Sequence, residues 1–153
     1  MKRLELLIPP PLIMLLIGLI MWLLSEMFPA LTLVWLHSIV AATTIGLAGL
    51  VISLTAAVTF KRASTTLNPK HPAETSTLIS SGAYRYSRNP MYLGVLLVLV
   101  GWAIYLGNLL SILCTLVFIA YITRFQIIPE ELLLEEKFEV EFLSYKSRVR
   151  RWL

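Results

Sequence analysis

The sequence predicts an all-α integral membrane protein with four transmembrane helices, the last two forming a hairpin, and a C-terminal amphipathic helix in the cytoplasm. Two observations predict this class. Of the 153 residues, 58% are hydrophobic and only 14% are charged, whereas a soluble domain is about 25% charged. The charges are also excluded from three long apolar runs. A chain of this length and composition corresponds to a single membrane domain, residues 1–153.

The apolar runs set the expected spans. No charge occurs from Leu6 to Leu24, from Ala30 to Phe60 or from Met91 to Thr123. As one helix the last run would measure about 50 Å, well beyond a hydrocarbon core of about 30 Å. Gly107-Asn108 is a turn signal near its middle and divides it into two helices. We therefore expect spans at about 10–25, 31–60, 91–106 and 109–124, a polar loop over 61–89 and a tail helix over 129–152.

The basic residues are distributed asymmetrically. With four spans, all 13 Lys and Arg residues fall on one side, and the opposite loops around Glu26 and Gly107-Asn108 carry none. Positive residues are typical of cytoplasmic loops. Both termini are therefore expected in the cytoplasm, and the expected location is a bacterial inner membrane. The net charge of +4 then reflects this sidedness, and no nucleic-acid partner is expected.

The tail after Arg124 has the pattern of an amphipathic helix. Pro129 suits a first helical turn, and the acidic Glu130 and Glu131 suit its positive end. Apolar residues then recur every three or four positions, which places them on one helical face: Leu134, Phe138, Phe142, Tyr145, Val149 and Trp152. This pattern predicts a helix on the inner leaflet, anchored by basic residues and Trp152.

The stretch from Ser81 to Gly94 joins a basic, tyrosine-rich loop to the third span. Asn89 suits a helix N-cap, and Pro90 suits the first helical position. The free N–H groups of such a helix start, with Arg85 and Arg88 beside them, can hold an anion. The hairpin should bring this junction close to Glu130 and Glu131. A cofactor that carries both charges could then meet arginines on one side and carboxylates on the other.

Other common site patterns are missing from the sequence. It contains no metal-ligand spacing, nucleophile elbow, phosphate loop or dinucleotide fingerprint. Cys114 is the only cysteine and cannot form an internal disulfide. His37 is expected to be a buried or interfacial helix residue. Gly46-Leu47-Ala48-Gly49, within the second span, is typical of close packing between membrane helices.

Two motifs carry a resemblance to a known family. The stretch Gly82-Ala83-Tyr84-Arg85-Tyr86-Ser87-Arg88-Asn89-Pro90-Met91-Tyr92-Leu93-Gly94 is one, and the tail with Pro129-Glu130-Glu131 and Val149-Arg150-Arg151-Trp152 is the other. From about Gly46 onward the chain resembles the isoprenylcysteine carboxyl methyltransferase and phospholipid methyltransferase group of integral membrane enzymes. The first stretch resembles that group's Arg-His-Pro-x-Tyr-x-Gly motif, and Thr65-Thr66-Leu67-Asn68-Pro69 resembles the segment that leads into it.

The chain departs from the family pattern at three positions. Asn89 stands in the place of the histidine, which removes a titratable imidazole although an amide still forms hydrogen bonds. In the tail, Glu139 stands where a glycine is usual, and Phe142 stands where a tyrosine is usual. These two tail residues affect the expected local shape of the tail more than its chemistry.

The resemblance implies S-adenosylmethionine as the methyl donor and a lipophilic acceptor from the bilayer, such as an isoprenylcysteine-type carboxylate, a lipid amine or a small isoprenoid. Methyl transfer from a sulfonium is an in-line displacement that needs neither a metal nor a covalent intermediate. The site must align the reacting atoms, exclude water and supply a deprotonated nucleophile. Two alternatives stay open: an NADPH-dependent membrane reductase of the sterol-reductase type, and a non-enzymatic membrane scaffold.

The expected site residues follow from the two motifs and from the resemblance. We expect Arg88 and the start of the third span to hold the cofactor's amino-acid end or the acceptor, and the two glutamates to face ribose hydroxyls or the cationic part of the cofactor. The expected cofactor-binding residues are Asn89, Pro90, Tyr92, Gly94, Glu130, Glu131, Gly46 and Gly49. The expected catalytic residues are Arg85, Arg88, Asn89, Tyr145 and Arg148.

Overall fold

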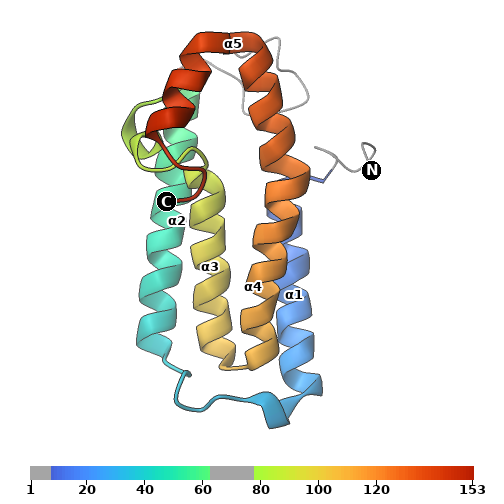
Figure 1. The fold of residues 1–153 in the computed structure, drawn as a ribbon. Coiled ribbons are helices and arrows are strands. Elements are labelled where there is room, and N and C mark those ends of the chain that lie inside the picture. The colour runs from blue at the N-terminus through green and yellow to red at the C-terminus, as the bar shows by residue number, and fades with distance from the viewer. Residues whose placement is uncertain (1–7, 63–77) are drawn as a thin grey trace.

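The computed structural model describes residues 8–62 and 78–153, which form an all-α bundle (Figure 1). The segment Thr65–Pro69 that resembles the family lies outside these residues. Helices α1 (Pro10–Met27), α2 (Ile39–Arg62), α3 (Pro90–Leu106) and α4 (Leu109–Ile122) run along the bundle. Helix α4 continues through the π-helical turn η5 (Thr123–Ile127) into α5 (Ile128–Arg148), and η2 (Pro29–Leu31) and η4 (Gly82–Arg85) are short 3-10 helices.

The length and composition of the helices are those of an integral membrane protein. Within the described residues, α1, α2 and the continuous stretch Leu109–Arg148 are long and apolar enough to cross a membrane. Helix α3 is equally apolar but has only 17 residues. The structure therefore gives three long candidate spans and one shorter apolar helix, whereas the arrangement of four spans with cytoplasmic termini stays a prediction.

Polar segments gather at one end of the bundle, which we call the polar end. It comprises the last turn of α2, residues 78–89, the start of α3, helix α5 and residues 149–153 (Figure 1). The described Lys and Arg residues belong to these segments or to η5. The loops at the opposite end, residues 28–38 and 107–108, contain neither Lys nor Arg.

The predicted hairpin is confirmed at Gly107-Asn108. Gly107 has a positive φ of 58°, a conformation that glycine adopts without steric cost. The Asn108 side chain accepts a hydrogen bond from the Leu110 N–H (2.9 Å) and caps α4, and its Nδ2 donates to the Phe28 carbonyl (3.0 Å). The turn is therefore held both by its own chemistry and by the loop after α1.

The second span begins later than the predicted residue 31. The Leu33 N–H donates to the Gly107 carbonyl (2.6 Å) and Thr32 forms an isolated bridge with Asn108, so these residues pair with the hairpin turn instead of extending α2. The Ser38 side chain accepts from the Ala41 N–H (3.2 Å) and starts the helix at Ile39. His37 therefore lies outside α2 and is exposed, contrary to the expectation of a helical residue.

Glycines bring α2 and α3 into close contact. A Cβ added to Gly49 would lie 2.5 Å from the Gly94 carbonyl oxygen, and one added to Gly101 would lie 2.7 Å from the Ala42 carbonyl oxygen. The Ser53 hydroxyl also donates to the Met91 carbonyl (3.0 Å). Small residues let membrane helices approach closely, so this contact fixes α3, and with it the junction at Asn89 and Pro90, against α2.

The tail helix begins close to the predicted residue, but it is not a separate helix. Helix α5 begins at Ile128 with Pro129 in its first turn, and it continues directly from α4 through η5. A proline inside a helix removes one hydrogen bond and clashes with the preceding turn. The π-helical turn Thr123–Ile127 contains Phe125, the residue four positions before Pro129 whose carbonyl the proline ring would meet in a regular α-helix.

The tail is also bent and ends earlier than predicted. Glu139 has φ 39° and ψ −113°, which breaks α5 into two halves, and Val149 is already extended. The second half folds back over the polar end toward residues 78–89 (Figure 1). The apolar residues on either side of Glu139 therefore do not share one face. Trp152 packs against the apolar core instead of serving as a free membrane anchor.

Candidate active site

The site lies at the polar end, where the start of α3 meets α5 and the C-terminal residues. Asn89 occupies the predicted N-cap position and Pro90 the first turn of α3, but the Asn89 side chain does not cap the helix. Its Nδ2 instead donates to the Arg151 carbonyl (3.0 Å). The predicted position is therefore confirmed and the predicted capping role of the side chain is wrong: Oδ1 accepts no hydrogen bond from the first turn of α3, and the amide is held by the tail through Nδ2.

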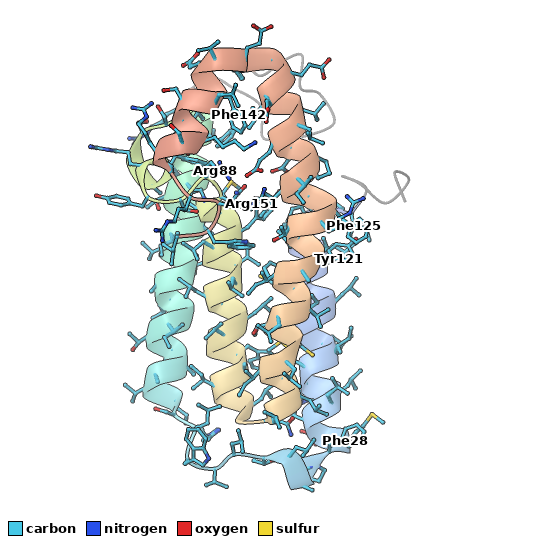
Figure 2. The ribbon with its side chains drawn as sticks, in the orientation of Figure 1. Phe28, Arg88, Tyr121, Phe125, Phe142 and Arg151 are labelled. Atoms are coloured by element: carbon cyan, nitrogen blue, oxygen red, sulfur yellow. The ribbon has the colours of Figure 1, made fainter. Side chains whose placement is uncertain are left out.

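Glu131 lies between two arginines. Arg88 Nη2 lies 2.9 Å from Glu131 Oε1, and both side chains are only 9% exposed. Arg151 donates from Nε to Oε1 (3.1 Å) and from Nη2 to Oε2 (2.7 Å), which is a bidentate contact. This hydrogen bond raises the pKa of Arg151. Figure 2 shows Arg88 and Arg151 close together beneath the returning half of α5.

The carboxylate of Glu130 contacts a different partner from the carboxylate of Glu131. The Tyr92 hydroxyl, from the first turn of α3, donates to Glu130 Oε1 at 2.6 Å. No ion pair of Glu130 is found in residues 8–62 and 78–153. The two glutamates were expected to act together, but the structure gives Glu131 two guanidinium groups and gives Glu130 a neutral phenol.

The second half of α5 is fixed onto the loop by aromatic residues. The Tyr145 hydroxyl donates to the Tyr84 carbonyl (2.7 Å), and Phe142 is fully buried beside it. Tyr84 packs edge-on against Phe60 at the end of α2, with ring centroids 5.4 Å apart. Burial raises the pKa of the Tyr84 phenol, so that group stays neutral. Tyr145 therefore holds the tail and the loop together.

Several predicted site residues do not join this cluster. Arg85 and Arg148 are exposed, and the Arg148 Nε donates to the Ser144 carbonyl of its own helix (3.1 Å). Gly49 and Gly94 face each other across the contact between α2 and α3. Gly46 has open space beside it and lines an apolar groove away from the polar end.

Sequence reasoning missed Arg151 and Ser87. The Ser87 hydroxyl donates to the Arg151 carbonyl (3.3 Å). Beside it, the Arg88 N–H donates to the Arg150 carbonyl (3.0 Å). Each residue lies in one of the two family-like stretches, Ser87 in Gly82–Gly94 and Arg151 in Val149–Trp152, and these were the available signals. They could not reveal the contacts, because the contacts depend on the bend at Glu139.

An apolar groove of about 610 Å³ runs between α1 and α2 over α3. Its walls include Gly18 and Trp22 of α1, Gly46 of α2, and Val98 and Trp102 of α3. Val98 lies six residues after Tyr92, which is about 9 Å along the helix axis. The groove therefore begins below the polar cluster, on the part of the bundle that is apolar on its outer surface.

These features define a class of protein. The apolar helical bundle is that of an integral membrane protein, and the buried acid–arginine cluster at one end is a candidate polar ligand site. Among the described residues no group of three or more acidic, histidine or cysteine side chains could hold a metal ion. The arrangement can bind a ligand that carries both negative and positive charge.

Comparison with known proteins gives the family. Residues 36–141, more than two thirds of the chain, match the family model described as phospholipid methyltransferase. The chain is also 51% identical over 63 residues to an uncharacterized protein of Haemophilus influenzae, a segment that covers 41% of this chain and all of that protein. No solved structure matches the chain.

The chain belongs to the phospholipid methyltransferase family, and it is an S-adenosylmethionine-dependent membrane methyltransferase that acts on a lipid-type acceptor. The match favours methyl transfer over the reductase and scaffold alternatives. The described residues fit the cofactor chemically. Arg88 has a buried Nε without a hydrogen-bond partner among them, which suits a carboxylate. Glu130 forms no ion pair with another described residue, so its carboxylate suits a positive charge.

Proposed function

We propose that the protein methylates a carboxylate on a hydrophobic tail, of the isoprenylcysteine type, at the cytoplasmic face of the membrane, and that the polar end is that face. One observation carries the proposal. The two family-like motifs, 43 positions apart in sequence from Arg88 to Glu131, meet in a buried cluster through the Arg88–Glu131 and Tyr92–Glu130 contacts. A lipid amine is the alternative acceptor.

The two glutamates have different roles in this proposal. Bound S-adenosylmethionine supplies a methyl group activated by the sulfonium charge. Glu130 faces that cationic part of the cofactor, and Tyr92 orients the carboxylate through the 2.6 Å hydrogen bond. Arg88, with the first N–H groups of α3, holds the cofactor's carboxylate. Glu131 acts as the buried counter-ion of the arginines.

The residue at position 89 favours a carboxylate as the acceptor. An amide side chain forms hydrogen bonds but does not take up a proton, so Asn89 cannot serve as a general base. A carboxylate arrives deprotonated, whereas an ammonium must first lose a proton. The apolar groove beside α3 supports a hydrocarbon tail on the acceptor, because a tail that lies there is shielded from water.

The experiment is transfer of labelled methyl groups from S-adenosylmethionine into a lipid extract and into a prenylcysteine analogue by the protein in lipid nanodiscs. We expect a product that releases volatile methanol in base, as a methyl ester does. A base-stable labelled lipid would replace the carboxylate proposal with the amine. The absence of any labelled product from either acceptor would refute both.

A matched pair of variants tests the role of Glu130. Glu130→Gln removes the charge that faces the cofactor and should weaken cofactor binding, measured by titration calorimetry, by about tenfold or more, as for the loss of a buried charge contact. Glu136→Gln makes the same change on an exposed part of the same helix and should bind as the wild type does. Equal affinities for the two variants would contradict the role of Glu130.

A further inference from the structure

The last described residues form a strap across the site. We use the name C-terminal strap for Arg150, Arg151 and Trp152. Its backbone carbonyls accept hydrogen bonds from the Arg88 N–H, the Ser87 hydroxyl and the Asn89 side chain. The Trp152 Nε1 donates to the Thr123 hydroxyl of η5 (3.3 Å). The strap therefore joins the loop, η5 and the start of α5, and it carries the Arg151 side chain to Glu131.

The two arginines beside Glu131 are not equivalent. Arg151 contacts both carboxylate oxygens, at 2.7 and 3.1 Å, and its side chain is 35% exposed. Arg88 contacts one oxygen at 2.9 Å and is 9% exposed. Its Nη1 reaches the Lys146 carbonyl only at 3.4 Å, and its Nε has no partner among the described residues. Arg151 is therefore the main partner of Glu131, and Arg88 keeps spare donors in a buried place.

A buried guanidinium donor without an acceptor is costly. The spare Nε of Arg88 therefore indicates that this side chain completes its hydrogen bonds with a bound anionic group. Such a group can draw Arg88 away from Glu131 only if the carboxylate keeps another cation, because an isolated buried charge costs several kcal/mol. Arg151 is placed to be that cation.

We infer that Arg151 is a positioning residue that neutralises Glu131 and thereby leaves Arg88 available to the carboxylate of S-adenosylmethionine. The inference rests on the proposed role of Arg88 in holding that carboxylate. Without Arg151, Arg88 becomes the nearest cation to Glu131 among the described residues, and the two buried charges pair with each other. The cofactor carboxylate must then compete with Glu131 for a single guanidinium.

The experiment compares the affinities of S-adenosylmethionine and its decarboxylated analogue, measured by titration calorimetry on the protein in lipid nanodiscs. Their ratio reports only the carboxylate contact. We expect a ratio of about tenfold or more for the wild type, since a hydrogen-bonded charge contact contributes that much. Arg88→Gln should bring the ratio close to one. Arg151→Gln should also reduce it toward one, although Arg88 is still present.

The decisive variant combines Arg151→Gln with Glu131→Gln. With no carboxylate to capture it, Arg88 is available again, and the ratio should return to within about threefold of the wild type. A purely structural role of Arg151 would not be rescued by a second substitution in the same cluster. The Arg150 side chain is exposed, and only its backbone carbonyl holds the loop. Arg150→Gln is therefore the matched control and should keep the wild-type ratio.

The outcomes separate the inference from the proposed function. If the wild type binds both ligands equally, the proposed role of Arg88 fails. If the wild type discriminates but Arg151→Gln keeps the full ratio, or the double variant does not regain it, the inference alone fails. Arg151→Lys keeps the charge and guards against misfolding of Arg151→Gln. A ratio near one for this variant would also overturn the inference, because it depends on the charge.

Discussion

The bend in α5 gives a stability prediction with an unusual sign. Glu139 is the one non-glycine residue with a positive φ (39°) in residues 8–62 and 78–153. A residue with a Cβ in such a conformation costs about 1–2 kcal/mol. Glycine lacks this cost but gains about 0.5–1 kcal/mol of entropy in the unfolded chain. Glu139→Gly should therefore stabilise the protein by about 1 kcal/mol, although it places glycine within a helical segment.

The control is a second glycine substitution on the same element. Glu141 is exposed, lies two residues further along α5 and has ordinary helical geometry. Glu141→Gly removes the same charge and should destabilise the protein by about 1 kcal/mol, as glycine does in a helix interior. The two variants should therefore differ by about 2 kcal/mol in the free energy of unfolding.

The assay is reversible unfolding in mixed micelles, followed by circular dichroism, with thermal midpoints measured on the same samples. For a chain of this size a change of 1 kcal/mol corresponds to a shift of about 2–4 °C, so the variants should move in opposite directions. A loss of stability in Glu139→Gly as large as that in Glu141→Gly would refute the backbone strain assigned to residue 139. Such a result would mean that residue 139 is helical and that the bend lies elsewhere.

Two further predictions concern packing. Gly94→Ala should destabilise the protein by about 2 kcal/mol or more in the same assay, because its Cβ would collide with the Ser53 hydroxyl and the backbone of α2. Gly18→Ala is the control: its Cβ would have nothing within 4 Å, so it should be neutral or stabilising. Equal effects of the two substitutions would contradict the close contact between α2 and α3. Tyr145→Phe should lower the free energy of unfolding by about 1–3 kcal/mol, because it leaves the Tyr84 carbonyl without its hydrogen-bond donor. An unchanged free energy of unfolding would mean that this hydrogen bond does not hold the tail.

The main features of the bundle could be predicted because they depend on local chemistry. Gly107-Asn108 is a turn signal in sequence, and in the structure Gly107 takes the positive φ while Asn108 caps α4. The predicted start of α2 is too early, because residues 30–38 are uncharged but not α-helical, and Thr32 and Leu33 pair with the hairpin turn. The polar Ser38 was the signal for the true start, and it outweighs the hydrophobicity of the residues before it.

The candidate site was predictable in part. The hairpin does bring Arg88 to Glu131 and Tyr92 to Glu130. The folded-back tail was not predictable from periodicity, because a repeat of three and four residues continues unchanged through Glu139 although the backbone does not. The glycine that is usual at that position was the available clue. Arg151 could not be assigned a partner, because its position depends on that bend.

The separation in sequence of the contacts at the polar end has a consequence for folding. Tyr92 and Glu130 are 38 positions apart, Tyr84 and Tyr145 are 61 apart, and Asn89 and Arg151 are 62 apart. Each helix, by contrast, closes its hydrogen bonds within a few residues, and contacts that are distant in sequence form more slowly. We therefore expect insertion of the helices to precede assembly of the polar end. A chain can have its full helix content before this cluster exists, so helicity alone is a poor measure of active enzyme.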